Sequence, residues 1–89
     1  MKKYGAKRDL NEAQIVRALR DIGATVHHIS APGLPDLMVG FRGNTYLMEV
    51  KGRKSKLTKP EQVFFDEWRG HAVIVRSVED ALSELGVVT

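Results

Sequence analysis

The sequence contains no cysteine, which excludes both a disulfide framework and a zinc site built on thiolates. Its apolar runs are only a few residues long, whereas a membrane-spanning helix needs about 20 apolar residues. The lysine-rich start is not followed by the apolar stretch of a signal peptide. We therefore expect no membrane span and no secretion signal, and we expect a protein of the cytoplasm.

The length of the chain allows one domain with a modest hydrophobic core. Its 89 residues lead us to expect a single domain over residues 1–89, and at this size a second copy often adds stability. Residues 1–8 hold four basic side chains, and we expect them to form a flexible basic arm. The net charge of +3 and the pI of about 9.5 fit a polyanionic partner.

A charged cluster is predicted on one face of a β-hairpin. Residues 36–41 are expected to form a strand, and the Gly43-Asn44 pair after it is typical of a tight turn. In the next strand Glu49 and Lys51 lie two positions apart, so they project from the same face. We place a two-residue turn at Gly43-Asn44. Asp36 then lies opposite Lys51 and diagonal to Glu49, on that same face.

Two carboxylates and one ammonium on a single sheet face are costly unless a cation offsets their repulsion and lost hydration. We expect Mg²⁺ or Mn²⁺ there, held by Asp36, Glu49 and the main-chain carbonyl of Val50, because these ions prefer oxygen ligands. Lys51 would orient or activate a water. This set is typical of metal-assisted phosphodiester hydrolysis. The spacing alone leaves an ordinary cross-strand salt bridge as the alternative.

Basic residues are concentrated directly after this strand. A phosphate backbone lying along them would be held beside the acids, whereas a solvated loop without a partner is the alternative. The residues expected to hold such a phosphate backbone are Arg53, Lys54, Lys56 and Lys59.

A helix is predicted from Asp9 to Ile22, because apolar residues recur there at helical spacing and Gly23 is a plausible end. Glu12 falls within the stripe that faces the core, which is unusual for a carboxylate. Two interpretations remain open. Either Glu12 is a third acid that reaches the metal through water, or it forms a capping box with Asp9 as N-cap.

The segment from Thr25 to Ser30 reads as a strand. His27 and His28 lie on opposite faces of it and cannot chelate one ion together.

Thr58 is expected to begin a second helix that runs to about Arg69. Gln62 lies at the edge of the apolar face of that helix, where its amide either hydrogen-bonds Lys51 or a water of the metal shell, or only borders the core.

Residues 71–75 are predicted to form a buried strand in the centre of the sheet, because their apolar residues run without alternation. Ser77 is expected to be the N-cap of a last helix that ends at Gly86. The predicted order is helix, three strands, helix, strand, helix (αβββαβα). This order indicates a small α/β fold with a mixed sheet flanked by helices.

These motif residues resemble a known family. Pro35-Asp36 and Glu49-Val50-Lys51, with twelve residues between Asp36 and Glu49, resemble the PD-(D/E)XK nuclease motif. The segment Gly33-Leu34-Pro35-Asp36-Leu37 resembles its virus-type replication-repair nuclease (VRR-NUC) branch. The resemblance extends from about Glu12 to about Trp68. It implies a restriction-endonuclease-like fold and DNA cleavage that depends on Mg²⁺ or Mn²⁺.

The resemblance also implies roles for single residues and for the assembly. Glu12 matches the family's first acidic position, and Gln62 matches a glutamine beside the acids. Stand-alone viral members, such as those of phages, resemble four-way (Holliday) junction resolvases, which implies a homodimer acting on branched DNA in the host-cell cytoplasm. A non-catalytic DNA-binding module with the same fold is the alternative.

Overall fold

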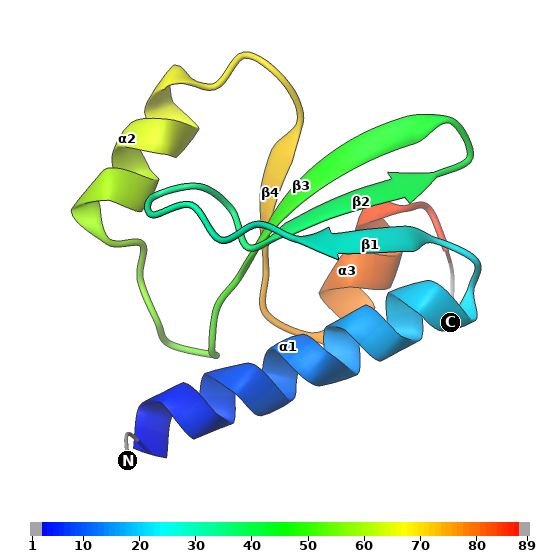
Figure 1. Cartoon of the computed structure of the whole chain (residues 1–89), viewed down its shortest axis with the longest axis horizontal. Helices are drawn as coiled ribbons and strands as arrows, with labels where there is room; N and C mark the ends of the chain where they lie inside the picture. The colour runs from blue at the N-terminus through cyan, green and yellow to red at the C-terminus, as the bar shows by residue number, and fades with distance from the viewer. Residues whose placement is uncertain (1–2, 88–89) are drawn as a thin grey trace.

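A mixed four-stranded sheet lies at the centre of the computed structural model, which describes residues 3–87, with side chains described from residue 10 (Figure 1). The helices and strands follow the predicted order. They are α1 (Lys3–Asp21), β1 (Thr25–His28), β2 (Leu37–Phe41), β3 (Asn44–Val50), α2 (Lys59–Glu67), β4 (Ala72–Val75) and α3 (Val78–Glu84).

The strands lie side by side in the order β1-β2-β3-β4. The first three pair antiparallel and β4 pairs parallel to β3, which confirms the mixed sheet. The central position predicted for β4 is wrong, because β4 forms an edge of the sheet. Val75 is buried among core residues and Val73 packs against them, but Ile74 between them is 36% exposed. The unbroken apolar run of β4 therefore does not reflect burial on both faces of the sheet.

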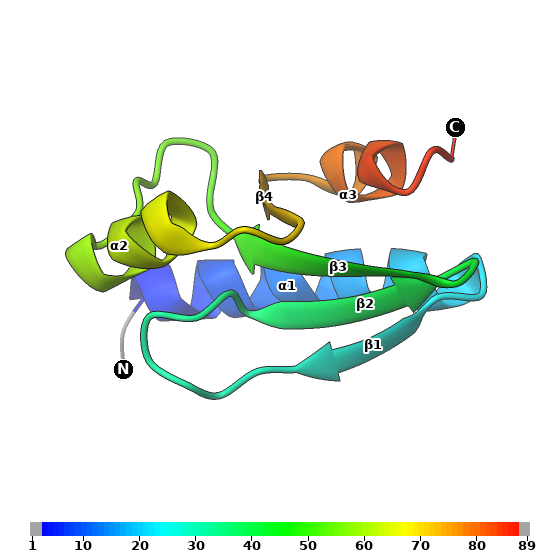
Figure 2. The same ribbon diagram turned by 90° about the horizontal axis from the view of Figure 1, so that it is seen from above.

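One face of the sheet is covered by α1 and α3, which lie on the same side of it (Figures 1 and 2). The strand residues on that face alternate with residues on the other, as a pleated strand requires. The main core residues are Ile15, Val16 and Leu19 of α1, Val26, Leu37, Val39, Met48, Val50 and Val75 of the strands, and Ala81, Leu82 and Leu85 of and just after α3. The charged residues predicted on β3 belong to the other face.

The β2–β3 turn differs from the prediction by one position. Phe41 pairs with Asn44, so the two turn residues are Arg42 and Gly43. Their φ angles are 50° and 81°, and positive φ at both central positions is what a type I′ hairpin turn requires. The preferred residue pairs of this turn have glycine second, and Gly43 takes that second central position, so the turn lies one residue earlier than Gly43-Asn44.

This turn moves the strand register by two residues. Leu37 pairs with Met48, and one further step brings Asp36 opposite Glu49, so the predicted pairing of Asp36 with Lys51 is wrong. Because side chains alternate with a period of two, a shift of two leaves each of them on its predicted face. The acids and the lysine are therefore still gathered at the same end of the sheet.

The helix ends are set by local signals, with one exception at the start of the chain. α1 begins at Lys3 rather than Asp9, so residues 3–8 continue the helix where a flexible arm was expected. Met1 and Lys2 lie outside the described residues. α2 begins after Thr58 as predicted, with a capping box of Thr58 and Glu61, and Ser77 is the N-cap of α3.

Candidate active site

Asp36 is held in place through both its main chain and its side chain. The preceding loop turns at Gly33, whose φ is +82°, and an added Cβ there would lie 3.2 Å from Cβ of Pro60. The main-chain carbonyl of Asp36 accepts a hydrogen bond from Ile29 N at 2.8 Å. Its carboxylate Oδ2 accepts one from the main-chain N–H of Val50, also at 2.8 Å. The predicted ligand therefore closes the end of the β2–β3 pair.

Glu49 is an acid in an enclosed environment. The residue is 0% exposed, and both of its carboxylate oxygens are inaccessible to solvent. Burial raises the pKa of Glu49 from 4.5 to about 8, helped by the nearby charges of Asp36 and Glu61. Lys51 acts in the opposite direction without offsetting them. At neutral pH the Glu49 carboxyl is therefore mainly protonated and shares a hydrogen bond with Asp36.

Lys51, the residue after β3, makes four polar contacts, two through its main chain and two through its ammonium. Its main-chain N–H donates to Val75 O at 3.1 Å, and its carbonyl accepts from Nδ2 of Asn11 at 3.3 Å. Its ammonium lies 3.4 Å from Oε2 of Glu49 and 2.7 Å from Oε1 of Glu61. The lysine is only 6% exposed, so this is a buried ammonium between two carboxyl groups.

Glu61 makes the lysine contact that was predicted for Gln62. Burial acts to raise the pKa of Glu61, but hydrogen bonds from Lys51 and Thr58 outweigh it, so the pKa lies below its usual value. Gln62 is exposed and donates to Oδ1 of Asp66 at 2.9 Å, one turn along α2. The structure therefore brings Asp36, Glu49, Lys51 and Glu61 together. The Gln62 amide instead contacts a residue of its own helix.

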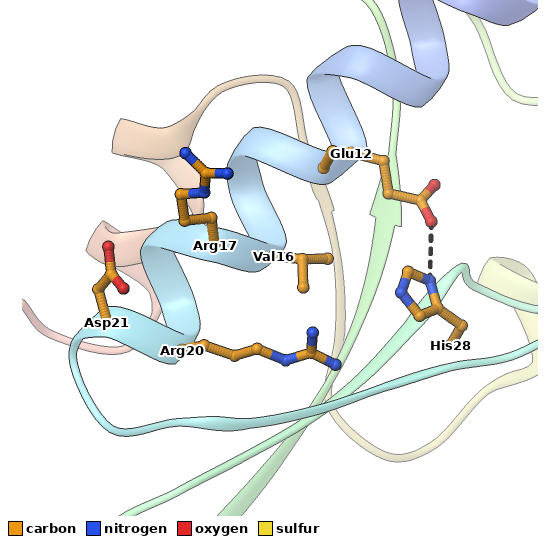
Figure 3. Close-up of a pocket in the computed structure, with 7 residues that line it drawn as sticks. Glu12, Val16, Arg17, Arg20, Asp21 and His28 are labelled. Atoms are coloured by element: carbon orange, nitrogen blue, oxygen red, sulfur yellow. Dashed lines mark hydrogen bonds and ion pairs between the residues drawn. The ribbon is translucent and has the colours of Figure 1, made fainter.

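Glu12 lies on α1 and faces β1. Its Oε2 is 3.0 Å from Nδ1 of His28, and its side chain is 20% exposed (Figure 3). The capping interpretation is wrong, because Asp9 lies inside the helix and cannot be its N-cap. The charges that act on the Glu49 carboxyl, among the described residues, come from Asp36, Glu61 and Lys51.

The Glu12–His28 pair forms one wall of a groove between α1 and β1, with a volume of about 580 Å³ (Figure 3). Arg20 spans the groove and donates to the main-chain carbonyl of Val26 at 2.9 Å. Arg17 and Asp21 also line it, so the groove carries both basic and acidic groups. The sequence gives no direct signal for the histidine contact, because it depends on how α1 crosses the sheet.

The basic loop between β3 and α2 is anchored at its base. Nη1 of Arg76 donates to the carbonyls of Gly52 at 2.6 Å and Ser55 at 2.8 Å. The main-chain N–H of Arg76 is in turn held by Oδ2 of Asp80 at 2.9 Å. The four predicted DNA-binding residues, Arg53, Lys54, Lys56 and Lys59, are all exposed.

The donor groups at this site fit a hard divalent ion. Within residues 10–87, no three His, Cys, Asp or Glu side chains are arranged around one position that could hold a metal ion. Mg²⁺ does not require three, since it is commonly bound by one or two carboxylates together with waters and substrate phosphates. A buried acid beside a second acid, Glu49 beside Asp36, is the environment that a divalent cation would stabilise.

Comparisons of the chain with models of protein families, with curated proteins and with solved structures find no match. The resemblance to VRR-NUC nucleases therefore depends on the motif residues themselves. Within residues 3–87, no helix has the length and apolar character needed to cross a membrane.

Proposed function

We propose that this protein is a divalent-metal-dependent DNA endonuclease with a restriction-endonuclease-like fold of the VRR-NUC type. The observation that carries the proposal is the cluster of Asp36, Glu49 and Lys51 at one end of the sheet, with the glutamate and the lysine buried. A buried charged group of this kind is expensive for a small domain, and functional sites are where such groups concentrate. The anchored basic loop begins directly after the lysine.

In this proposal Asp36, Glu49 and the Val50 carbonyl hold Mg²⁺ or Mn²⁺. When bound, such an ion polarises a phosphate oxygen and lowers the pKa of a water. Glu49 releases its proton to become a ligand, because a carboxylate binds metal only when ionised. Glu12, held by His28, is the third acid and acts through water. Gln62 contacts Asp66 and has no part in the proposed step.

Lys51 has the groups needed next to a scissile phosphate. Its ammonium offers three N–H donors, and the main-chain contacts to Val75 and Asn11 fix the point from which the side chain extends. It orients the attacking water or donates to a phosphate oxygen, where negative charge develops as the bond breaks. Arg53, Lys54, Lys56 and Lys59 hold the DNA backbone beside it.

We further propose that the working unit is a homodimer acting on branched DNA such as a four-way junction. A single site cuts one strand in each encounter, whereas two sites related by a twofold axis cut two strands symmetrically. Two basic loops would also form a longer track for DNA than one.

The experiment that tests the function uses labelled duplex, flap and four-way junction DNA, with Mg²⁺, Mn²⁺ or a chelator. We expect cleavage that requires metal and that is abolished in Asp36→Asn and Glu49→Gln, while both variants still bind DNA. DNA binding by the wild type without cleavage of any substrate would instead identify a non-catalytic DNA-binding module. Cleavage that survives in both variants would contradict the assignment of the site.

A further inference from the structure

The two ends of the basic loop meet at a single oxygen atom. Residues 52–58 connect β3 to α2. Oε1 of Glu61 accepts a hydrogen bond from Nζ of Lys51, directly before this loop, at 2.7 Å. The same oxygen accepts the main-chain N–H of Thr58, the last residue of the loop, at 2.8 Å. Glu61 thus closes the loop that we propose to bind DNA and contacts the lysine at its start.

The contact between Glu61 and Lys51 is the shorter of the two carboxyl contacts of the ammonium. Its N···O distance of 2.7 Å is that of a charge-assisted hydrogen bond, whereas the 3.4 Å to Glu49 is long for one. Both side chains are largely buried, with 7% of Lys51 and 12% of Glu61 exposed, so water screens the pair little. Glu61 therefore fixes the ammonium more strongly than Glu49 does.

We propose that Glu61 is a positioning residue, which holds the Lys51 ammonium against Glu49 and couples its position to the basic loop. It acts through Lys51, so it need not touch DNA or the reacting atoms. A DNA backbone that draws the loop outward moves the Thr58 end, and through the shared oxygen of Glu61 it moves the lysine as well. The catalytic consequence rests on the proposed function, whereas the position of the lysine can be measured without it.

Two variants of Glu61 distinguish the loss of its negative charge from the loss of its hydrogen bonds. Glu61→Gln keeps a carbonyl oxygen that can accept from both Lys51 and Thr58, whereas Glu61→Ala removes both contacts. Thr58→Ala is the matched control, since it removes the hydroxyl that accepts from Glu61 N at 3.4 Å and leaves both contacts of Oε1 in place. Gln62→Ala is a second control on the same helix turn.

Nitrogen-15 NMR of the metal-free protein measures the position of the lysine directly. A hydrogen-bonded and buried ammonium exchanges slowly, and its signal is assigned to Lys51 by its loss in Lys51→Arg. We expect this signal in the wild type, Thr58→Ala and Glu61→Gln, and its loss in Glu61→Ala. An unchanged signal in Glu61→Ala, or no such signal in the wild type, would overturn the inference.

Single-turnover cleavage at saturating DNA tests the consequence for the reaction. We expect Glu61→Ala to lower the rate by up to about a hundredfold, the loss that a misplacement of about 1 Å can cause, with an unchanged Kd for DNA. Glu61→Gln should recover most of the rate, and Thr58→Ala should keep it although the helix loses its cap. Equal rate losses in Glu61→Ala and Thr58→Ala would overturn the inference, because helix stability would then explain both. If the wild type cleaves nothing and the NMR results are as expected, the proposed function fails and the positioning of Lys51 stands.

Discussion

Oδ2 of Asp36 accepts the main-chain N–H of Val50 at 2.8 Å, so the proposed metal ligand also closes the end of the hairpin. Asp36→Asn keeps an oxygen for this bond, whereas Asp36→Ala leaves a buried N–H without it, which costs about 1–3 kcal/mol. We predict that both variants lose Mn²⁺ binding in calorimetry and that only Asp36→Ala also loses stability in urea. Mn²⁺ binding by Asp36→Asn with wild-type affinity would contradict the ligand assignment.

Glu49 makes the stability of the metal-free protein depend on pH. Its pKa is about 8 in the folded protein and 4.5 ordinarily, so between these values the folded state holds a proton that the unfolded state releases. The stabilisation is therefore fully present below about pH 4.5 and is lost as the pH rises through about 8.

We predict that urea unfolding of the metal-free protein shows a decreasing free energy of unfolding across this range, and that Glu49→Gln flattens the decrease. The glutamine is neutral at every pH, so it removes the titration and keeps the size of the side chain. A variant with the same pH dependence as the wild type would show that another group titrates.

Much of the fold follows from local sequence signals. The order of elements and the caps at Thr58 and Ser77 were predicted, because capping and periodicity are properties of neighbouring residues. The start of α1 was not predicted, because residues 3–8 carry no apolar stripe at helical spacing. The edge position of β4 also could not be predicted, because an apolar strand looks the same at the centre and at an edge.

For the candidate site, the sequence predicted which residues belong to it better than it predicted which of them are in contact. Glu49 and Lys51 share a face because side chains along a strand alternate with a period of two. This prediction is therefore correct although the position of the turn was predicted wrongly. The role of Glu61 is different. Its capping box is visible in the sequence, but its contact with Lys51 depends on where α2 lies in space. Asn11 and Arg76 contact main-chain carbonyls, which no side-chain pattern indicates.

The basic loop should set the salt dependence of DNA binding. Each phosphate contact adds about 0.9 to the slope of log K against log salt on duplex DNA. We predict that changing Arg53, Lys54 and Lys56 to Gln lowers this slope and weakens all DNA substrates alike, as fluorescence anisotropy at several salt concentrations would show. Changing Arg17 and Arg69, exposed basic residues elsewhere, is the control. An unchanged slope in the loop variant would identify the loop as a solvated surface.

The proposed homodimer predicts both a mass and a cutting pattern. We expect sedimentation and light scattering at micromolar protein to give twice the chain mass, and a four-way junction labelled on each strand to be nicked at two symmetric positions. A monomer that cuts junction arms singly would refute the dimer and leave the metal site unaffected.

The central claim is that the Asp36, Glu49 and Lys51 cluster hydrolyses DNA with water as the nucleophile, and the most direct test is cleavage in water enriched in oxygen-18. Wild-type protein with Mn²⁺ should place one oxygen-18 atom in each new terminal phosphate, as measured by mass spectrometry of the products. The double variant Asp36→Asn, Glu49→Gln should form no such product. Products without the label, or labelled products formed equally by the double variant, would contradict the account.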